Sequence, residues 1–112
     1  MKQWEIWHYP CPSRERPHPM IILSNDEICS NASYKDVNAI PCSSVRDDRM
    51  PRITEVFLDA TDGLDRKSSV RCNFFYSLPK AEFQNLRGTV SINRRKQIVK
   101  VIAISFRFPV AL

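Results

Sequence analysis

Two side chains near strand-like segments of this sequence have the chemistry to act on an anionic substrate. His18 lies between Pro17 and Pro19, and an imidazole with an ordinary pKa of about 6.5 can give or take a proton near neutral pH. Arg71 keeps its charge, so it can clamp a phosphate with two parallel hydrogen bonds. A histidine between prolines is also typical of a packing residue, and a strand arginine is more commonly solvated. Residue type alone therefore leaves both roles open.

Hydroxyl and further guanidinium groups follow in the next part of the chain. Ser43 and Ser44 can donate to phosphate oxygens, although serines after a strand more commonly cap a turn. Arg46, Arg49 and Arg52 occupy one loop-like stretch, where they either contact a polyanion or are simply solvated.

An aromatic run covers residues 74–76. Strand alternation predicts that Phe75 points to one face and that Phe74 and Tyr76 point to the other. One face can stack nucleic-acid bases, whereas we expect core packing for at least half of the run.

The composition is that of one small basic domain. With 112 residues the chain can build one core, so residues 1–112 are expected to form a single domain. The formal net charge of +5 favours a polyanionic partner, or reflects solubility alone. Only two glycines are present, so we do not expect the phosphate-cradling glycine loops of Walker or Rossmann enzymes.

Cysteine spacing and hydropathy bear on metals and location. The four cysteines lie far apart and form no Cys-x-x-Cys pair, so neither a metal nor a cofactor is expected. No apolar run reaches the ~20 residues of a membrane-spanning helix, and the N-terminus lacks the apolar run of a signal peptide. We therefore expect a cytoplasmic protein with reduced thiols and no membrane contact.

Short strands must position these residues. Alternation, continuous apolar runs and turn signals predict strands over residues 4–9, 20–23, 37–40, 53–58 and 69–78. The apolar run at 20–23 predicts a buried strand. The next predicted strand, over residues 37–40, is expected to end at Pro41.

Helical segments are fewer. Residues 27–36 form a loop or a short helix, and residues 79–83 permit a helical turn with proline first. The tail is ambiguous, because apolar residues recur at helical spacing from Ile98 to Phe106 while residues 99–104 equally suit a strand. Several short strands and at most two helices predict a mainly β fold with α, a small partly open SH3-like barrel.

Taken in order, several motifs resemble those of the MazF/PemK/Kid toxins. Residues 4–7 (WEIW), 19–26 (PMIILSND) and 40–44 (IPCSS) are similar to the family's GEIW, RPVLILSND and VVPITS strands. Residues 69–73 (SVRCN) resemble the Kid-type VRCD strand, and residues 88–91 (GTVS) resemble the G-x-L-S that precedes the last helix. The resemblance runs from Trp4 to about Phe106 and implies a C-terminal helix on the SH3-like barrel.

The same resemblance implies a function. It implies a homodimeric toxin that cleaves single-stranded RNA, mRNA included, selectively at short sequence motifs and without a metal. A small acidic antitoxin would restrain it. Any DNA contact would then pass through the antitoxin complex. The candidate catalytic residues are Arg71 as phosphate clamp and Ser43, at the position of a family threonine, as donor, with His18 as acid or base because of its own imidazole chemistry. The implied RNA-binding residues are Arg16, Ser44, Asn73, Arg46 and Arg49.

This chain also departs from the family pattern. His18 stands at the position of the family arginine, Asn73 replaces an aspartate, and Phe74 and Tyr76 replace a glutamine and an arginine. Two other functions therefore stay open. One is a CcdB-like toxin that poisons a partner protein, although residues 106–109 (FRFP) lack the Trp-Gly-Ile ending of that branch. The other is a degenerate member that only binds nucleic acid or an antitoxin.

Overall fold

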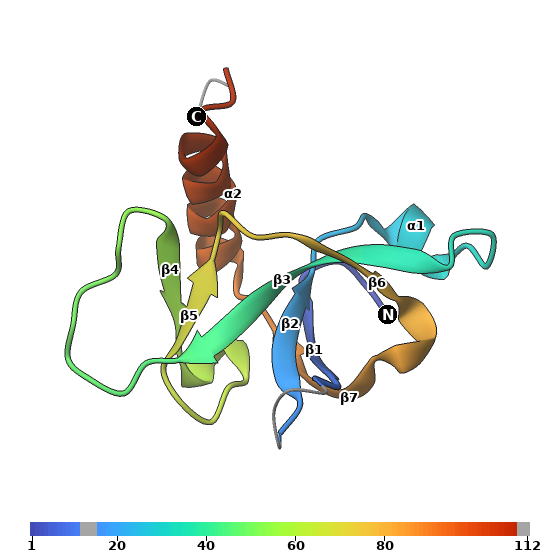
Figure 1. Ribbon diagram of the computed structural model, residues 1–112, viewed down its shortest axis with the longest axis horizontal. Coiled ribbons are helices and arrows are strands. Elements are labelled where there is room, and N and C mark those ends of the chain that lie inside the picture. The colour runs from blue at the N-terminus through green and yellow to red at the C-terminus, as the bar shows by residue number, and fades with distance from the viewer. Residues whose placement is uncertain (12–15, 110–112) are drawn as a thin grey trace.

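The computed structural model describes residues 1–11 and 16–109, which form one open antiparallel sheet with a long C-terminal helix (Figure 1). The strands pair in the order β4-β5-β3-β2-β1-β7, and β6 pairs with β3. The elements are β1 (Glu5–Tyr9), β2 (His18–Ile22), α1 (Asp26–Ser30), β3 (Asp36–Ser44), β4 (Glu55–Leu58), η1 (Ala60–Asp62), β5 (Ser68–Arg71), β6 (Tyr76–Pro79), η2 (Lys80–Glu82), β7 (Gln84–Thr89) and α2 (Ile92–Phe106). The predicted mainly β, partly open fold with a C-terminal helix is confirmed.

The long strand β3 connects the two halves of the sheet. Its first part, residues 36–39, pairs with β6, and its last part, residues 42–44, pairs with β5. The strand passes through Pro41, so the prediction that it ends there is wrong. Pro41 lies where β3 changes partner from β6 to β5, so its missing N–H breaks no ladder hydrogen bond on that edge.

Strand β2 is buried on both of its faces, as its continuous apolar run predicts. Ile21 packs into a core with Ile40 and with Ile98 of α2, while Met20 and Ile22 pack into a second core on the opposite side. Alternation of side chains along one strand thus supplies two cores. The ends of β2 are thereby held firmly, including the end that carries His18.

The tail forms a helix, α2, whose start is fixed by a buried carboxylate. Asp62 is fully buried; its Oδ1 accepts from the Ser91 backbone N–H at 2.9 Å, and its Oδ2 accepts from the Asp59 backbone N–H at 3.1 Å. The two glycines pack against each other beside it, since a Cβ on Gly88 would lie 2.9 Å from the Gly63 Cα and 2.4 Å from the Asp62 carbonyl oxygen. Tertiary contacts at its first residues therefore favour a helix for the tail, where periodicity alone allowed a helix or a strand.

Further predicted strands have other bounds in the structure, and one observed strand was not predicted. Residues 69–78 form two strands, because a turn in which the Phe74 N–H donates to the Arg71 carbonyl interrupts them. Strand β4 begins only at Glu55, whose backbone N–H closes a turn on Arg52. Strand β7, with the sequence QNLRGT, was not predicted; it forms through its pairing with β1.

Candidate functional site

Neighbouring strands bring the three predicted catalytic residues to one face of the sheet. Met20 of β2 pairs with Pro41 of β3, and the same register continued along the strands puts His18 opposite Ser43. Ser43 pairs in turn with Ser69 of β5, so Arg71 follows two residues later on that face. Residues on the other face of these strands, such as Val70, enter the core.

A cavity of about 420 Å³ lies on this face. His18, Ser43 and Arg71 all line it, together with the aromatic side chains of Tyr9, Phe74 and Tyr76. Three residues that are 25 to 53 positions apart in the sequence therefore face one space. Their catalytic roles remain predictions.

A second cavity, of about 470 Å³, adjoins the first and shares His18 and Ser43 with it. Three of the predicted RNA-binding residues, Arg16, Ser44 and Arg46, line it, and Arg66 joins them. Within residues 1–11 and 16–109, no hydrogen bond or ion pair engages the guanidinium groups of these arginines or of Arg71. The two cavities together thus present unneutralised positive charge, which suits a polyanion.

The hydrogen bonding of His18 indicates which ring nitrogen is available. Its Nδ1 lies 3.4 Å from the Cys42 carbonyl oxygen, a long contact to an atom that can only accept. The contact therefore places the ring proton on Nδ1 and leaves Nε2 as the acceptor in the neutral ring. His18 is half-buried at the end of β2, where the strand holds its backbone.

Arg49, also predicted to bind RNA, is held by a carboxylate away from both cavities. Its two terminal nitrogens each lie 2.8 Å from an oxygen of Glu55, which is buried on β4. The Ser69 hydroxyl and the Arg52 backbone N–H donate to the same carboxylate. The Arg49 hydrogen bonds, with those from Ser69 and Arg52, lower the pKa of Glu55 from 4.5 to about 2, against the effect of burial. Arg49 thereby ties the 45–54 loop to the sheet.

Asn73 and the aromatic run occupy the turn between β5 and β6. Asn73 is exposed and lines neither cavity. Phe74 and Tyr76 line the first cavity, while Phe75 stacks on Phe106 of α2 with ring centroids 5.2 Å apart. The predicted division of the run between two faces is confirmed. The expectation of core packing is wrong, since all three rings are 41 to 45% exposed.

Other reactive groups near the cavities are held in their protonated forms. A hydrogen bond from the Tyr9 hydroxyl to Glu82 raises the pKa of Tyr9 to about 12. Burial raises the pKa of the Cys42 thiol, and it raises the pKa of Cys72 to about 12. Neither the Tyr9 hydroxyl nor these two buried thiols are thus ionised at neutral pH.

Sequence reasoning did not identify Tyr9 or Arg66 as part of this region. Tyr9 pairs directly with His18 across β1 and β2, a signal that becomes visible only once the register is known. Arg66 lies in the connection between η1 and β5, which no pattern places beside β2.

The described residues offer neither a metal-ligand cluster nor a membrane-spanning helix. Across residues 1–11 and 16–109, no three or more His, Cys, Asp or Glu side chains are grouped closely enough to hold a metal ion. The helices in the same part of the chain are all too short or too polar to span a bilayer.

Comparisons with known proteins agree with this architecture. The chain is similar to an endoribonuclease in complex with its cognate antitoxin from a mycobacterial species, with 19% identity, a TM-score of 0.81 and 99% of each chain covered. It is similar to the Mycobacterium tuberculosis toxin MazF-mt6, with 19% identity, a TM-score of 0.76, and 92% and 96% of the two chains covered. A chain of the MazE-MazF structure from Deinococcus radiodurans shares 14% identity and a TM-score of 0.72, with 95% and 94% covered. At these identities the structures show a common fold.

The sequence itself gives the family. No curated protein matches the chain. The family model described as PemK-like, MazF-like toxin of type II toxin-antitoxin system matches residues 2–106. Because that match spans nearly the whole chain, the protein belongs to the PemK-like, MazF-like toxins of type II toxin–antitoxin systems.

Proposed function

We propose that this toxin is an endoribonuclease that cleaves single-stranded RNA, mRNA included, without a metal ion. The observation that carries the proposal is the single cavity lined by His18, Ser43 and Arg71. These residues supply a proton acceptor, a hydroxyl donor and a fixed cation, which are the groups that cleavage by the RNA's own 2′-hydroxyl requires. Solved structures of the same fold include endoribonucleases.

Each residue has one role in the proposed reaction. Nε2 of His18 takes the proton of the 2′-hydroxyl, whose oxygen then attacks the adjacent phosphorus. The guanidinium of Arg71 and the hydroxyl of Ser43 donate to the non-bridging oxygens, on which negative charge accumulates. The bond to the 5′-oxygen breaks, and that oxygen takes a proton from water. The products are a 2′,3′-cyclic phosphate and a 5′-hydroxyl.

The second cavity would hold the rest of the strand. Arg16 and Arg46, whose guanidinium groups pair with no other described residue, offer cations to the backbone phosphates, and Ser44 adds a hydroxyl donor. Phe74 and Tyr76 lie 45% exposed beside the scissile position, where a base can stack on them. The predicted RNA contacts at Asn73 and Arg49 lie outside these cavities, and Arg49 acts instead through the loop that carries Arg46.

The same positive surface suits a small acidic antitoxin that excludes RNA, and any DNA contact would be made through that complex.

We also propose a cytoplasmic homodimer. Val99, Ile104 and Phe106 of α2 are 41 to 46% exposed, next to an apolar cavity of about 340 Å³ lined in part by Trp4 and Phe108. A second copy of the chain would cover this apolar surface.

Incubation of the purified protein with single-stranded RNA in excess EDTA tests the proposal. The expected products end in a 2′,3′-cyclic phosphate and a 5′-hydroxyl, as resolved by mass spectrometry. Cleavage that requires added magnesium, or that leaves a 5′-phosphate, would overturn the proposed mechanism. A folded protein that binds RNA and cleaves none would instead be the degenerate family member considered above.

A further inference from the structure

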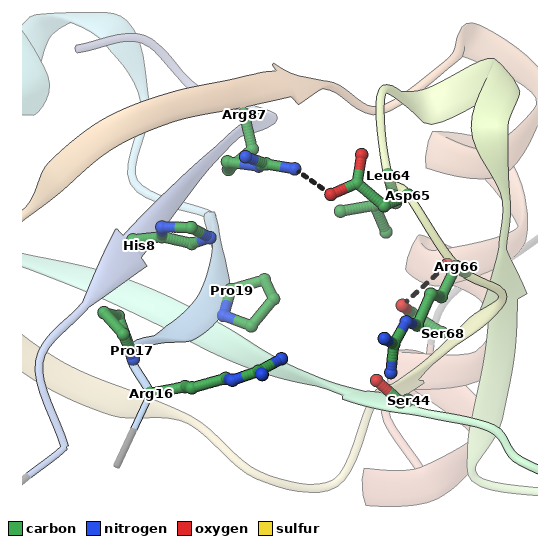
Figure 2. A pocket seen from close by; sticks show the side chains of 10 residues that line it. All are labelled: His8, Arg16, Pro17, Pro19, Ser44, Leu64, Asp65, Arg66, Ser68 and Arg87. Carbon is green, nitrogen blue, oxygen red and sulfur yellow. Dashed lines mark hydrogen bonds and ion pairs between the residues drawn. The ribbon is translucent and has the colours of Figure 1, made fainter. Parts of the chain in front are cut away.

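A third cavity, of about 310 Å³, lies between β1, β7 and the connection that precedes β5 (Figure 2). It shares Arg16, Ser44 and Arg66 with the second cavity, so the two cavities adjoin. His8 and Arg87 line only this third cavity among the three, and the resemblance of the sequence to known toxins pointed to neither of them.

The charges in this cavity are poorly balanced. Figure 2 shows the guanidinium group of Arg66 beside Ser44 and the side chain of Arg16 reaching toward them from the opposite wall, with His8 and Arg87 on the other side of the space. Asp65 is the one carboxylate among the described residues that line the cavity, and it pairs with Arg87 at 2.5 Å. Among the described residues that line the cavity, no carboxylate pairs with Arg16 or Arg66, so both would attract an anion bound between them.

The pKa of His8 is also affected by the positive charge in this cavity. Burial, followed by the positive charge of Arg87, lowers the pKa of His8, while Asp65 acts in the opposite direction. His8 is therefore mainly neutral in the free protein at neutral pH. An anion bound beside it would favour its charged form and would add a donor to the site.

We propose that Arg66, Arg87 and His8 form a second phosphate subsite, which holds a backbone phosphate of the RNA next to the scissile one. This proposal rests on the proposed ribonuclease function. Its occupant is RNA because the cavity adjoins the one that His18 and Ser43 line, so a single strand can reach both. The subsite would fix the register of the strand, and its loss should weaken RNA binding more than it slows the chemical step.

The test uses the whole protein and a short 2′-O-methyl RNA of randomised sequence, which lacks the attacking hydroxyl and cannot be cleaved. Arg87→Gln is the diagnostic variant, because Asp65 is 82% exposed and this ion pair contributes little to stability. Lys100→Gln, on the exposed side of α2, removes the same charge elsewhere. A double variant, Arg87→Gln with Asp65→Asn, keeps the net charge of the parent.

A plot of the logarithm of RNA affinity against the logarithm of salt concentration should have a shallower slope for both Arg87 variants than for the parent. The difference should be about 0.7 in slope, the value for one phosphate contact on a single strand, while Lys100→Gln keeps the slope of the parent. If the Arg87 variants match Lys100→Gln in slope and affinity, the subsite does not exist.

A second readout needs no substitution at the subsite. The chain has two histidines, so NMR of the imidazole carbons gives two signals, which His18→Ala assigns. Binding of the RNA analogue should raise the pKa of His8, and an unchanged value would overturn the proposal.

Failure of the parent to cleave any RNA would remove the proposed function and leave these binding results standing. Cleavage with unchanged slopes would remove the subsite alone.

Discussion

Glu55→Gln tests whether the Arg49–Glu55 pair holds the 45–54 loop on the sheet. The carboxylate is 4% exposed and accepts from both terminal nitrogens of Arg49 and from Ser69. Its pKa is lowered from 4.5 to about 2, which corresponds to on the order of 3 kcal/mol of stability. Because the folded state favours the charged form, this contribution is complete above pH 4.5 and is lost as the pH falls toward 2.

Urea unfolding of the parent and of Glu55→Gln, followed by circular dichroism over this pH range, gives the two stability curves. We expect Glu55→Gln to be less stable by about 3 kcal/mol at neutral pH and the gap to narrow as the pH drops through 4.5. The stability of Glu27→Gln, at an exposed position of α1, should follow the same pH dependence as that of the parent. A neutral-pH gap under about 1 kcal/mol, or one that is independent of pH, would refute the reasoning.

Three further predictions concern packing and assembly. Gly88→Ala should lower the free energy of unfolding by about 1–3 kcal/mol, because the new Cβ meets the backbone of Asp62 at 2.4 Å; an unchanged urea midpoint would contradict this. Arg107→Gly should raise stability by up to about 1 kcal/mol in thermal unfolding, since Arg107 ends α2 with a φ of 54°, and a lower melting temperature would count against it. Light scattering at micromolar concentration should give twice the chain mass of 13.0 kDa, whereas a monomer would argue against the proposed dimer.

Much of the fold follows from local patterns in the sequence. The run at residues 20–23 predicts a strand buried on both faces, and Met20, Ile21 and Ile22 divide between two cores as such a strand requires. Strand β7 was missed because its residues have little strand preference and its pairing with β1 is non-local. The end of β3 was mispredicted at Pro41 for a related reason. A proline is tolerated inside a strand only where no partner strand needs its N–H, and that depends on which strands flank it.

The candidate site was predictable in its residues and not in its shape. His18, Ser43 and Arg71 could be named because their motifs resemble those of a toxin family, and they do line one cavity. Arg49 could not be separated from Arg46 in the sequence, because the buried partner that engages it, Glu55, lies on another element. His8 and Arg87 carried no motif; the non-local pairing of β1 with β7 brings their strands together, and both line one cavity with Arg66.

The rate of RNA cleavage by His18→Ala tests the central claim most directly. Under single-turnover conditions with EDTA, the parent and Lys100→Ala should cleave at the same rate. His18→Ala, folded as judged by circular dichroism, should be slower by at least about 100-fold, because removal of a general base costs that much or more. A His18→Ala variant that cleaves as fast as the parent would contradict the account.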